Sequence, residues 1–394
     1  MFKLRFLTSG ESHGKGLIGI LEGIPAGLSI SSDDINKELT RRQKGYGRGG
    51  RMKIESDSVE IISGVRWGET IGSPIALFIE NKDWKNWQKG MSADVENAGS
   101  IEPVTRPRPG HADLPGVLKY GHSDIRNVLE RSSARETAMR VALGAIAKRF
   151  LLEFGINIGS YVIRIGTVRY EIPKPVRDKS EFEDLFKRAE ESEVRCPDSE
   201  VSTKMKHLID DTMSRGDTLG GVFEIVVLGL PHGIGSYIHW DKRLEARLSY
   251  AIMGIQAIKA VEIGDGFGMA EKLGSESMDE IFYNPEEGRF YRKTNHAGGI
   301  EGGMTNGMPV IIRAAMKPIP TLRKPLRSVD IITKEPFEAA YERSDICAVP
   351  AASVVSEAVV ALVITDSFLE KFGGDNIKET ENNYKSYLKY LEGF

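Results

Sequence analysis

The sequence predicts a single intertwined α/β domain, and three observations support this. Short apolar stretches bounded by glycine and proline recur along the chain, as expected for strands that end in tight turns. Stretches with helical apolar spacing lie between them. No linker-like change in composition divides the 394 residues, so one domain is predicted over 1–394.

The composition limits the class of protein. Apolar residues make up 40% and charged residues 28% of the chain, as in a soluble globular protein. The net charge of −3 argues against a globally basic nucleic-acid binder, so any anion site must be a local cluster. The N-terminus lacks a signal-peptide core, and no apolar run approaches the roughly 18 residues of a membrane span. Cys196 and Cys347 are far apart, which suits a reducing cytoplasm.

The first 90 residues contain patterns for a strand, a capped helix and a second strand between a turn and a loop. Alternating apolar residues over 2–6 predict a strand. Asp33 and Asp34 precede the stretch 35–42 and predict a capped helix. Residues 66–90 have the pattern of a turn, a strand and a polar loop.

The second half contains longer helical stretches. The charged segment 170–215 predicts a peripheral helical insertion, and 309–322 predicts a strand that runs into a proline-broken turn. Residues 342–374 predict a loop and a buried helix, and 375–394 a helical tail. A further helix is predicted over 241–262 from the apolar residues Leu244, Leu248, Ile252, Ile255 and Ile258.

Two passages share a pattern of turn residues and predict an internal duplication. At a constant offset of 206 residues, Gly10, Gly14, Gly23, Pro25 and Gly27 match Gly216, Gly220, Gly229, Pro231 and Gly233. The repeated unit would be a turn, a strand, a Gly-x-Pro-x-Gly turn and a helix. Chance agreement of common turn residues is the alternative. Only the first copy carries a histidine, in the pair Ser12-His13.

The stretch 106–155 begins with arginines and prolines and enters the longest confidently predicted helix. Ser133 and Glu136 have the spacing of a capping box at its start. Free N–H groups beside Arg131 and Arg135 would suit a phosphate or a carboxylate. An ordinary cap on a surface helix is the alternative.

Residues 40–54 form a second basic region, with six basic side chains and no acidic one. A solvated loop or an RGG-like RNA-binding tail are the alternatives. An RGG tail is normally repetitive and disordered, whereas this segment lies between a predicted helix and a predicted strand. A small polyanion is therefore favoured as the partner, because arginine grips carboxylate and phosphate with two hydrogen bonds.

Two of the seven histidines are candidates for catalysis. His13 and His111 lie in glycine-flanked loops with few apolar neighbours, where packing roles are rare. Histidine titrates near neutral pH and suits general acid chemistry on a phosphate ester. Asp345 stands between Arg343 and an apolar run, so it predicts either a salt bridge or a proton acceptor. The other histidines are predicted to be structural or superficial.

Metal and nucleotide sites are poorly supported. The steps His111-x-Asp113 and His122-x-Asp124 could supply metal ligands, but there is no HExxH motif and no cysteine pair. We therefore predict no metal. A P-loop and a dinucleotide-binding GxGxxG motif are also absent, which disfavours nucleotide hydrolysis and a Rossmann dehydrogenase.

Taken together and in order, the motifs resemble the chorismate synthase family from about residue 8 to 365. They are GESHG, RRQKGYGRGGRM, RPGHAD, KYG, RSSARETA, GIQAIKAVEIGDGF, NHAGGIEGGMTNG, MKPIPT and RSDICAVPA. The chain departs from the family at Met278, where histidine is frequent, at Pro115, where threonine is usual, and at Ser353 and Ser356, where glycines are common. None of these four positions is a candidate site residue.

The resemblance implies a β-α-β sandwich fold, with antiparallel sheets and helices, and a homotetramer. It also implies a carbon–oxygen lyase that converts 5-enolpyruvylshikimate 3-phosphate to chorismate and phosphate, the last step of the shikimate pathway. This 1,4-anti-elimination requires reduced FMN without net redox change. NADPH would take part only if the chain reduced its own flavin, and the lack of a large insertion favours a monofunctional enzyme. The rival classes are a metal-dependent phosphohydrolase and an RNA-binding module built on the GYGRGGR loop.

The resemblance also implies residue roles. His13 would assist departure of phosphate, His111 would keep the reduced flavin in its useful protonation state, and Asp345 would take part in removing the C6 proton through flavin N5. The implied FMN contacts are Arg131, Ser132, Ser133, Gln256, Ala257, Gly302, Lys317, Pro318, Ile319, Pro320, Thr321 and Arg343. The implied contacts to the substrate or NADP are Ser12, Arg42, Arg48, Arg51 and Arg135, with Arg343 as a further grip on the substrate.

Overall fold

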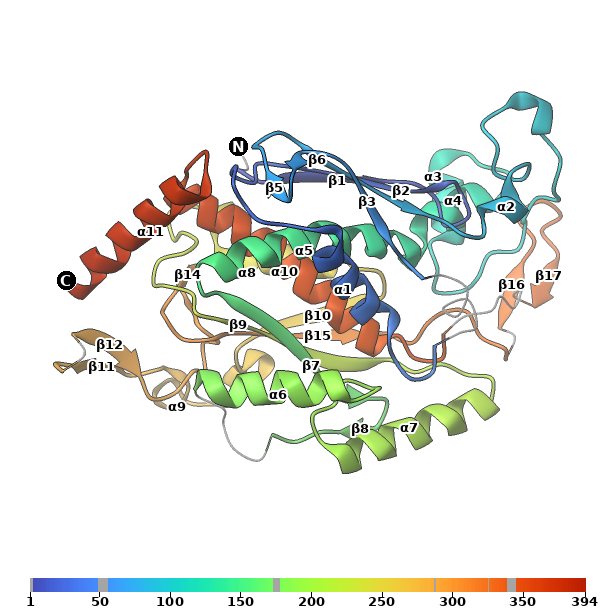
Figure 1. Cartoon of the computed structure of the whole chain (residues 1–394). Coiled ribbons are helices and arrows are strands. Elements are labelled where there is room, and N and C mark those ends of the chain that lie inside the picture. The colour runs from blue at the N-terminus through green and yellow to red at the C-terminus, as the bar shows by residue number, and fades with distance from the viewer. Residues whose placement is uncertain (1–2, 49–55, 173–177, 287, 325, 339–344) are drawn as a thin grey trace.

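The chain forms three stacked layers, a four-stranded sheet, a layer of helices and a five-stranded sheet (Figure 1). This confirms the predicted β-α-β sandwich. The structure is a computed structural model that describes residues 3–48, 56–172, 178–286, 288–324, 326–338 and 345–394.

The first sheet is antiparallel throughout, in the order β1-β2-β6-β3. Its first strand begins and ends three residues later than the predicted stretch 2–6, because Arg5 pairs with Glu22 and Ser9 with Ile18. One face of the sheet covers the helices, so alternate residues such as Leu17 and Leu21 are buried. The strands are β1 (Arg5–Ser9), β2 (Gly16–Glu22), β6 (Ile75–Glu80) and β3 (Val59–Ser63).

The second sheet is also antiparallel, in the order β10-β15-β9-β7-β8. The helix predicted over 241–262 is wrong in its second half. Gly254 ends the helix, Ala257 adopts a left-handed backbone (φ 67°), and Ile258 then opens a strand. The strands are β10 (Ile258–Ile263), β15 (Val310–Met316), β9 (Gly221–Leu228), β7 (Asn157–Ile165) and β8 (Val168–Arg169).

Four helices fill the middle layer: α1 (Ser32–Gln43), α5 (Thr137–Glu153), α8 (Leu244–Met253) and α10 (Val349–Phe372). α10 is long and apolar enough to span a membrane by length and composition, contrary to the expectation that no run approaches that length. Its most apolar window is 94% buried within the protein. The composition of this helix therefore follows from its position between two sheets.

The N-terminus of α1 differs in detail from the prediction. Its cap is Ser31 rather than the pair Asp33-Asp34. The Ser31 side chain accepts the Asp34 N–H, and the Asp34 carboxylate accepts the Ser31 N–H, so the two form a capping box.

The segment predicted as a peripheral insertion forms α6 (Lys179–Glu191) and α7 (Ser199–Ser214), which lie outside the second sheet (Figure 1). Phe182 and Leu185 of α6 pack on Tyr161 and Val226 of that sheet.

The C-terminal tail forms α11 (Ile377–Glu392). The remaining elements are β4 (Val65–Arg66), β5 (Glu69–Thr70), α2 (Trp84–Trp87), η2 (Val95–Asn97), α3 (Asp113–Tyr120), α4 (Arg126–Ser132), η3 (Ala134–Glu136), η4 (Trp240–Lys242), η5 (Gly266–Glu271), α9 (Gly274–Ser277), β11 (Ile281–Asn284), β12 (Arg289–Arg292), β13 (Ile300–Glu301), β14 (Met304–Thr305), β16 (Arg327–Val329) and β17 (Pro336–Glu338).

The structure supports the internal duplication. In the first copy, the Gly27 N–H donates to Thr70 O at 2.8 Å, and Thr70 Oγ1 donates to Pro25 O at 2.6 Å. The second copy repeats both bonds at the same lengths with Gly233, Thr305 and Pro231. Repetition of a three-residue hydrogen-bond pattern is hard to reconcile with chance agreement of turn residues.

A buried cluster of charges joins the helical layer to the second sheet. Glu357 of α10 is fully buried and accepts hydrogen bonds from Arg41 (2.7 Å), Lys148 (2.7 Å) and Ser160 Oγ (2.6 Å). Arg195 approaches the same carboxylate at 3.2 Å. Burial is the largest influence and acts to raise the pKa of Glu357, but the surrounding cations outweigh it and lower that pKa.

We predict that Glu357→Ala destabilises the protein by about 3–5 kcal/mol, because it leaves buried cations without their counter-charge. Urea denaturation at neutral pH measures the loss. Since the pKa of Glu357 is lowered in the folded state, its contribution is present at neutral pH and is lost only as the pH falls below about 4. Glu22→Ala, in the exposed pair with Arg5, is the control and should cost less than about 1 kcal/mol. Equal losses would contradict the prediction.

Candidate active site

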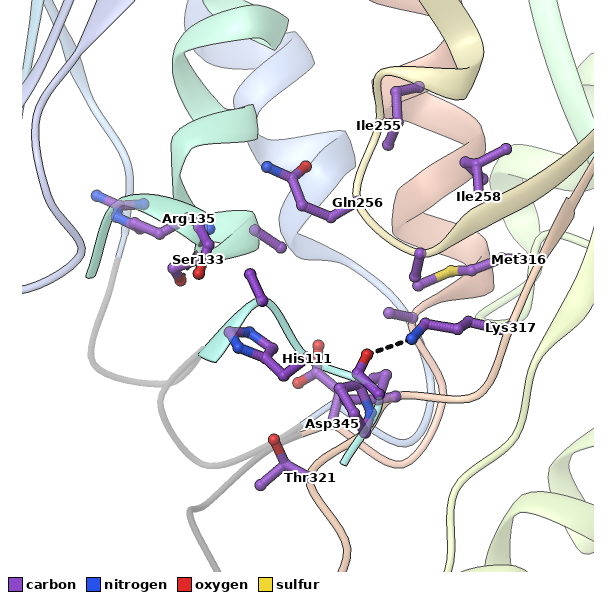
Figure 2. A pocket seen from close by; sticks show the side chains of 18 of the residues that line it. His111, Ser133, Arg135, Ile255, Gln256, Ile258, Met316, Lys317, Thr321 and Asp345 are labelled. Carbon is purple, nitrogen blue, oxygen red and sulfur yellow. Dashed lines mark hydrogen bonds between the residues drawn. The ribbon is translucent and has the colours of Figure 1, made fainter. Parts of the chain in front are cut away.

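A cavity of about 560 Å³ opens where loops from both halves of the chain meet (Figure 2). This size is within the range of small-molecule sites. Its wall comprises Ser12, His13, Arg42, Arg48, Arg108, Gly110, His111, Ala112, Leu129, Ser132, Ser133, Ala134, Arg135, Met253, Ile255, Gln256, Ala257, Ile258, Lys259, Met316, Lys317, Ile319, Pro320, Thr321, Asp345 and Ala348.

The wall is strongly cationic. Asp345 is its only carboxylate among the described residues, and two histidines accompany it. The permanent cations are six: Arg42, Arg48, Arg108, Arg135, Lys259 and Lys317. Arg48, Arg108 and Arg135 pair with Asp345, Asp113 and Asp57. Six cations against these three carboxylates leave a local excess of positive charge, which suits the cavity to an anion.

Arg42 is held rigidly from the end of α1. It is buried, its Nε donates to Thr137 Oγ1 at 3.1 Å, and its Nη2 donates to Ala134 O at 3.0 Å. Burial above all, with the nearby charges of Arg48 and Arg135, lowers the pKa of Arg42 to about 10. The guanidinium therefore stays charged at neutral pH.

Its neighbour Arg41 has a different role. Arg41 points into the buried Glu357 cluster, and Arg48 lies 3.2 Å from Asp345. The described part of the basic segment 40–54 thus turns its arginines inward, which is unlike an exposed RNA-binding tail.

Arg135 is fixed by two side chains that sequence analysis did not single out. Its Nε donates to Asn81 Oδ1 at 3.0 Å, and its Nη1 donates to Asp57 Oδ1 at 2.5 Å. Asn81 also donates to the carbonyls of Glu11 and Gly14, both at 2.9 Å. One asparagine therefore couples the GESHG loop to Arg135. A single Asn or Asp in a loop gives no sequence signal for such a contact.

The predicted capping box at Ser133 is wrong. Ser133 accepts the N–H of Arg135, but it opens the short helix η3, and α5 begins only at Thr137. The Glu136 carboxylate turns away from Ser133 and accepts from Gln256 Nε2 at 3.0 Å. The contact between Glu136 and Gln256 therefore takes the place of the predicted capping-box contact between Glu136 and the backbone of Ser133.

His111 lies in the loop before α3 and is oriented by Asp113. Its Nδ1 is 2.5 Å from Asp113 Oδ1, and Arg108 Nε donates to Asp113 Oδ2 at 2.9 Å. Burial acts to raise the pKa of Asp113, but the hydrogen bonds from His111 and Arg108 outweigh it and hold that pKa well below its usual range. The first His-x-Asp step is thus a histidine–carboxylate pair. Among the described residues, no group of three or more His, Cys, Asp or Glu could hold a metal ion.

Lys317 fixes the loop of His111 from the other side of the cavity. Its Nζ donates to Gly110 O, the bond drawn in Figure 2. Burial, and then the nearby Lys259, lower the pKa of Lys317.

One side of the cavity suits a flat heteroaromatic ring. Ile255, Ile258 and Met316 supply apolar surface there (Figure 2), and Met253 also lines the cavity. Gln256 Oε1 is buried beside them and has no hydrogen-bond partner among the described residues. A buried acceptor without a partner is costly, so this oxygen is suited to receive an N–H from a bound molecule.

Most of the residues predicted from sequence lie in this one cavity. His13, His111 and Asp345 all line it, with Ser12, Arg42, Arg48 and Arg135 of the substrate set and Ser132, Ser133, Gln256, Ala257, Lys317, Ile319, Pro320 and Thr321 of the cofactor set. Within the described part of the chain, three predicted residues are not part of the wall: Pro318, Gly302 in the β13–β14 turn, and Arg131, which donates to the carbonyls of Thr8 and Gly10. Arg51 and Arg343 lie outside the described residues.

The fold and the site define a β-α-β sandwich protein with a cationic small-molecule cavity flanked by two histidines. The family model for chorismate synthase matches residues 4–369. The chain is 57% identical to the chorismate synthase of Geobacter sulfurreducens, over 99% of this chain and 100% of the relative. It is 55% identical to that of Aquifex aeolicus, over 99% of each. A solved structure described as a crystal structure of chorismate synthase is 44% identical, with a TM-score of 0.81 over 99% of both chains. The chain belongs to the chorismate synthase family.

Proposed function

We propose that this chain is a carbon–oxygen lyase that converts 5-enolpyruvylshikimate 3-phosphate to chorismate and phosphate by 1,4-anti-elimination, with reduced FMN as cofactor. Family membership supports this activity. It does not support a metal-dependent phosphohydrolase or an RNA-binding module.

The observation that carries the proposal is the charge of the cavity wall. The substrate bears a phosphate and two carboxylates, and six permanent cations face it across the cavity. Arg42, Arg48 and Arg135 are proposed to grip it, because buried guanidiniums bind such groups with short, directional hydrogen bonds. Their contacts to Thr137, Asp345 and Asp57 hold them in place before the substrate arrives.

The residues present also fit a reduced flavin. The apolar wall and the unpaired Gln256 Oε1 suit a ring with N–H donors. Ser132, Ser133, Gln256, Ala257 and the segment 317–321 would hold it. When bound, the flavin would supply transient electron density that no side chain can offer.

The catalytic side chains are proposed to handle protons. His13 would donate a proton from its ring to an oxygen of the departing phosphate. His111, held by Asp113, would keep a proton available for the cofactor. Asp345, paired with Arg48, would accept the proton that leaves carbon.

The unit of function is proposed to be the whole chain acting in a homotetramer. The cavity needs loops from both halves, for example Arg42 from the first and Lys317 from the second. Large apolar residues are exposed on the first sheet at Phe6, Leu7, Ile18, Ile20 and Ile62, and a second copy could cover them. Two free, buried cysteines are consistent with a cytoplasmic location. An external enzyme is proposed to reduce the flavin, so NADPH would act only indirectly.

The decisive experiment is anaerobic turnover of 5-enolpyruvylshikimate 3-phosphate with and without reduced FMN. We expect chorismate only when the reduced flavin is present, and no effect of a chelator. Activity that needs a metal and ignores flavin would overturn the proposal.

His13→Ala and His111→Ala are each expected to lower turnover by about 10²-fold or more, because each removes a proton-transfer group. Rapid assays of chorismate formation give the rates, and circular dichroism checks folding. Near-normal turnover in both variants would remove the two histidines from the mechanism.

Arg48→Ala is expected mainly to weaken substrate binding. One charge-assisted hydrogen bond is worth about 1.5–3 kcal/mol, so KM should rise by about tenfold or more. His207→Ala is a suitable control, since His207 lies on α7 and does not line the cavity. Unchanged KM and kcat in Arg48→Ala would place Arg48 outside the substrate site.

A further inference from the structure

A buried glutamate holds His13 by two of its atoms. Glu130 of α4 is almost fully buried, and its carboxylate is 2.8 Å from His13 Nδ1 and 2.8 Å from the backbone N of His13. In return, the Ser12 N–H donates to the Glu130 carbonyl at 3.1 Å. These hydrogen bonds connect the GESHG loop to α4 at His13, which lines the cavity.

Neighbouring side chains restrict the imidazole further. The ring centroids of Trp87 and His13 are 4.5 Å apart, and the guanidinium of Arg126 lies 4.9 Å from the centroid of the Trp87 ring. Arg126 also approaches the Glu130 carboxylate at 3.8 Å. The remaining ring nitrogen, Nε2, has the Asp83 carboxylate 4.0 Å away, beyond hydrogen-bond length.

We propose that Glu130 is the positioning residue for His13. Its carboxylate accepts Nδ1–H, which fixes the tautomer and the ring orientation and leaves Nε2 to exchange a proton with the substrate. This rests on the proposed acid role of His13. In that step the doubly protonated ring is the acid: its Nε2–H bond breaks, an O–H bond forms on the departing phosphate, and the neutral ring keeps its Nδ1–H, which still donates to the Glu130 carboxylate. The carboxylate itself stays ionised, as the aspartate of a catalytic triad does.

The same unit occurs a second time in the cavity wall. Asp113 lies against Nδ1 of His111 as Glu130 lies against Nδ1 of His13. An arginine accompanies each carboxylate, Arg108 at 2.9 Å from Asp113 and Arg126 at 3.8 Å from Glu130, and Arg108 Nη2 also lies 3.2 Å from His111 Nδ1. In both loops, a carboxylate therefore holds the histidine ring by its Nδ1.

Glu130→Gln separates positioning from structure. Glutamine keeps the shape of the side chain and an oxygen that can accept the His13 backbone N–H, but its amide can also donate. Nδ1 then no longer needs to carry the proton. The matched control is Glu224→Gln, another buried glutamate, which pairs with Arg313 in the second sheet. The control should lower stability but leave the properties of His13 unchanged.

The first readout is the tautomer of His13 in protein without flavin. Solid-state NMR of ¹⁵N-histidine-labelled protein measures it, and His13→Ala identifies the signals. We expect a protonated Nδ1 and an unprotonated Nε2 in the neutral ring of the native protein. Glu130→Gln should populate the opposite tautomer, whereas Glu224→Gln should not. Identical spectra in Glu130→Gln and the native protein would overturn the proposal.

The second readout is a double-mutant cycle in turnover. Glu130→Gln alone is expected to slow turnover by about 10²-fold, the scale of a misplaced acid. In a His13→Ala background it should cost little more, because residues that act as one unit are non-additive. An equal loss in both backgrounds would show a structural role and overturn the proposal. If native protein makes no chorismate at all, the proposed function fails, but the tautomer measurement still decides the role of Glu130.

Discussion

The sandwich depends on one buried carboxylate. Glu357 lies in the middle of α10, and the cations that surround it come from α1, α5 and the segment before α7. A buried charge is tolerable only when its counter-charges stay in place, so these elements cannot shift independently. Hydrophobic contact alone would let helices slide between two sheets, since apolar burial is not directional. The charge cluster makes their arrangement specific.

The same constraint sets the geometry of the cavity. Arg41 binds Glu357, and the next residue, Arg42, faces the cavity and meets Thr137 at the start of α5. An adjacent pair of arginines on one helix thus serves two places, the buried charge cluster and the cavity wall. Ala348, the N-cap residue of α10, lines the cavity. The helix that carries Glu357 therefore also reaches the cavity wall. The cations of the site are therefore held before an anion binds, which lowers the cost of ordering them.

The residues alone predicted an intertwined α/β domain, the two loop histidines and the arginine clusters, whereas the sandwich and most of the cavity wall were implied by the family resemblance of the glycine-rich motifs. Sequence analysis erred where tertiary contacts overruled local pattern. Ser133 and Glu136 have capping-box spacing, yet Glu136 turns to Gln256. Ile255 and Ile258 continue a helical spacing, yet Gly254 ends the helix. The partners Asp57 and Asn81 went unnoticed, since their contacts join segments far apart in the chain and no spacing reveals them.

The two histidine–carboxylate pairs follow from the cationic wall itself. Under the proposed function, the six permanent positive charges of the wall would attract a phosphorylated substrate. The two histidines would have to handle protons beside those charges. Placing Glu130 and Asp113 behind the rings, against Nδ1, supplies negative charge where the histidines need it. Neither carboxylate is part of the cavity wall, where Asp345, paired with Arg48, is the carboxylate among the described residues. Their position behind the rings therefore leaves the positive charge of the wall to the proposed anionic substrate.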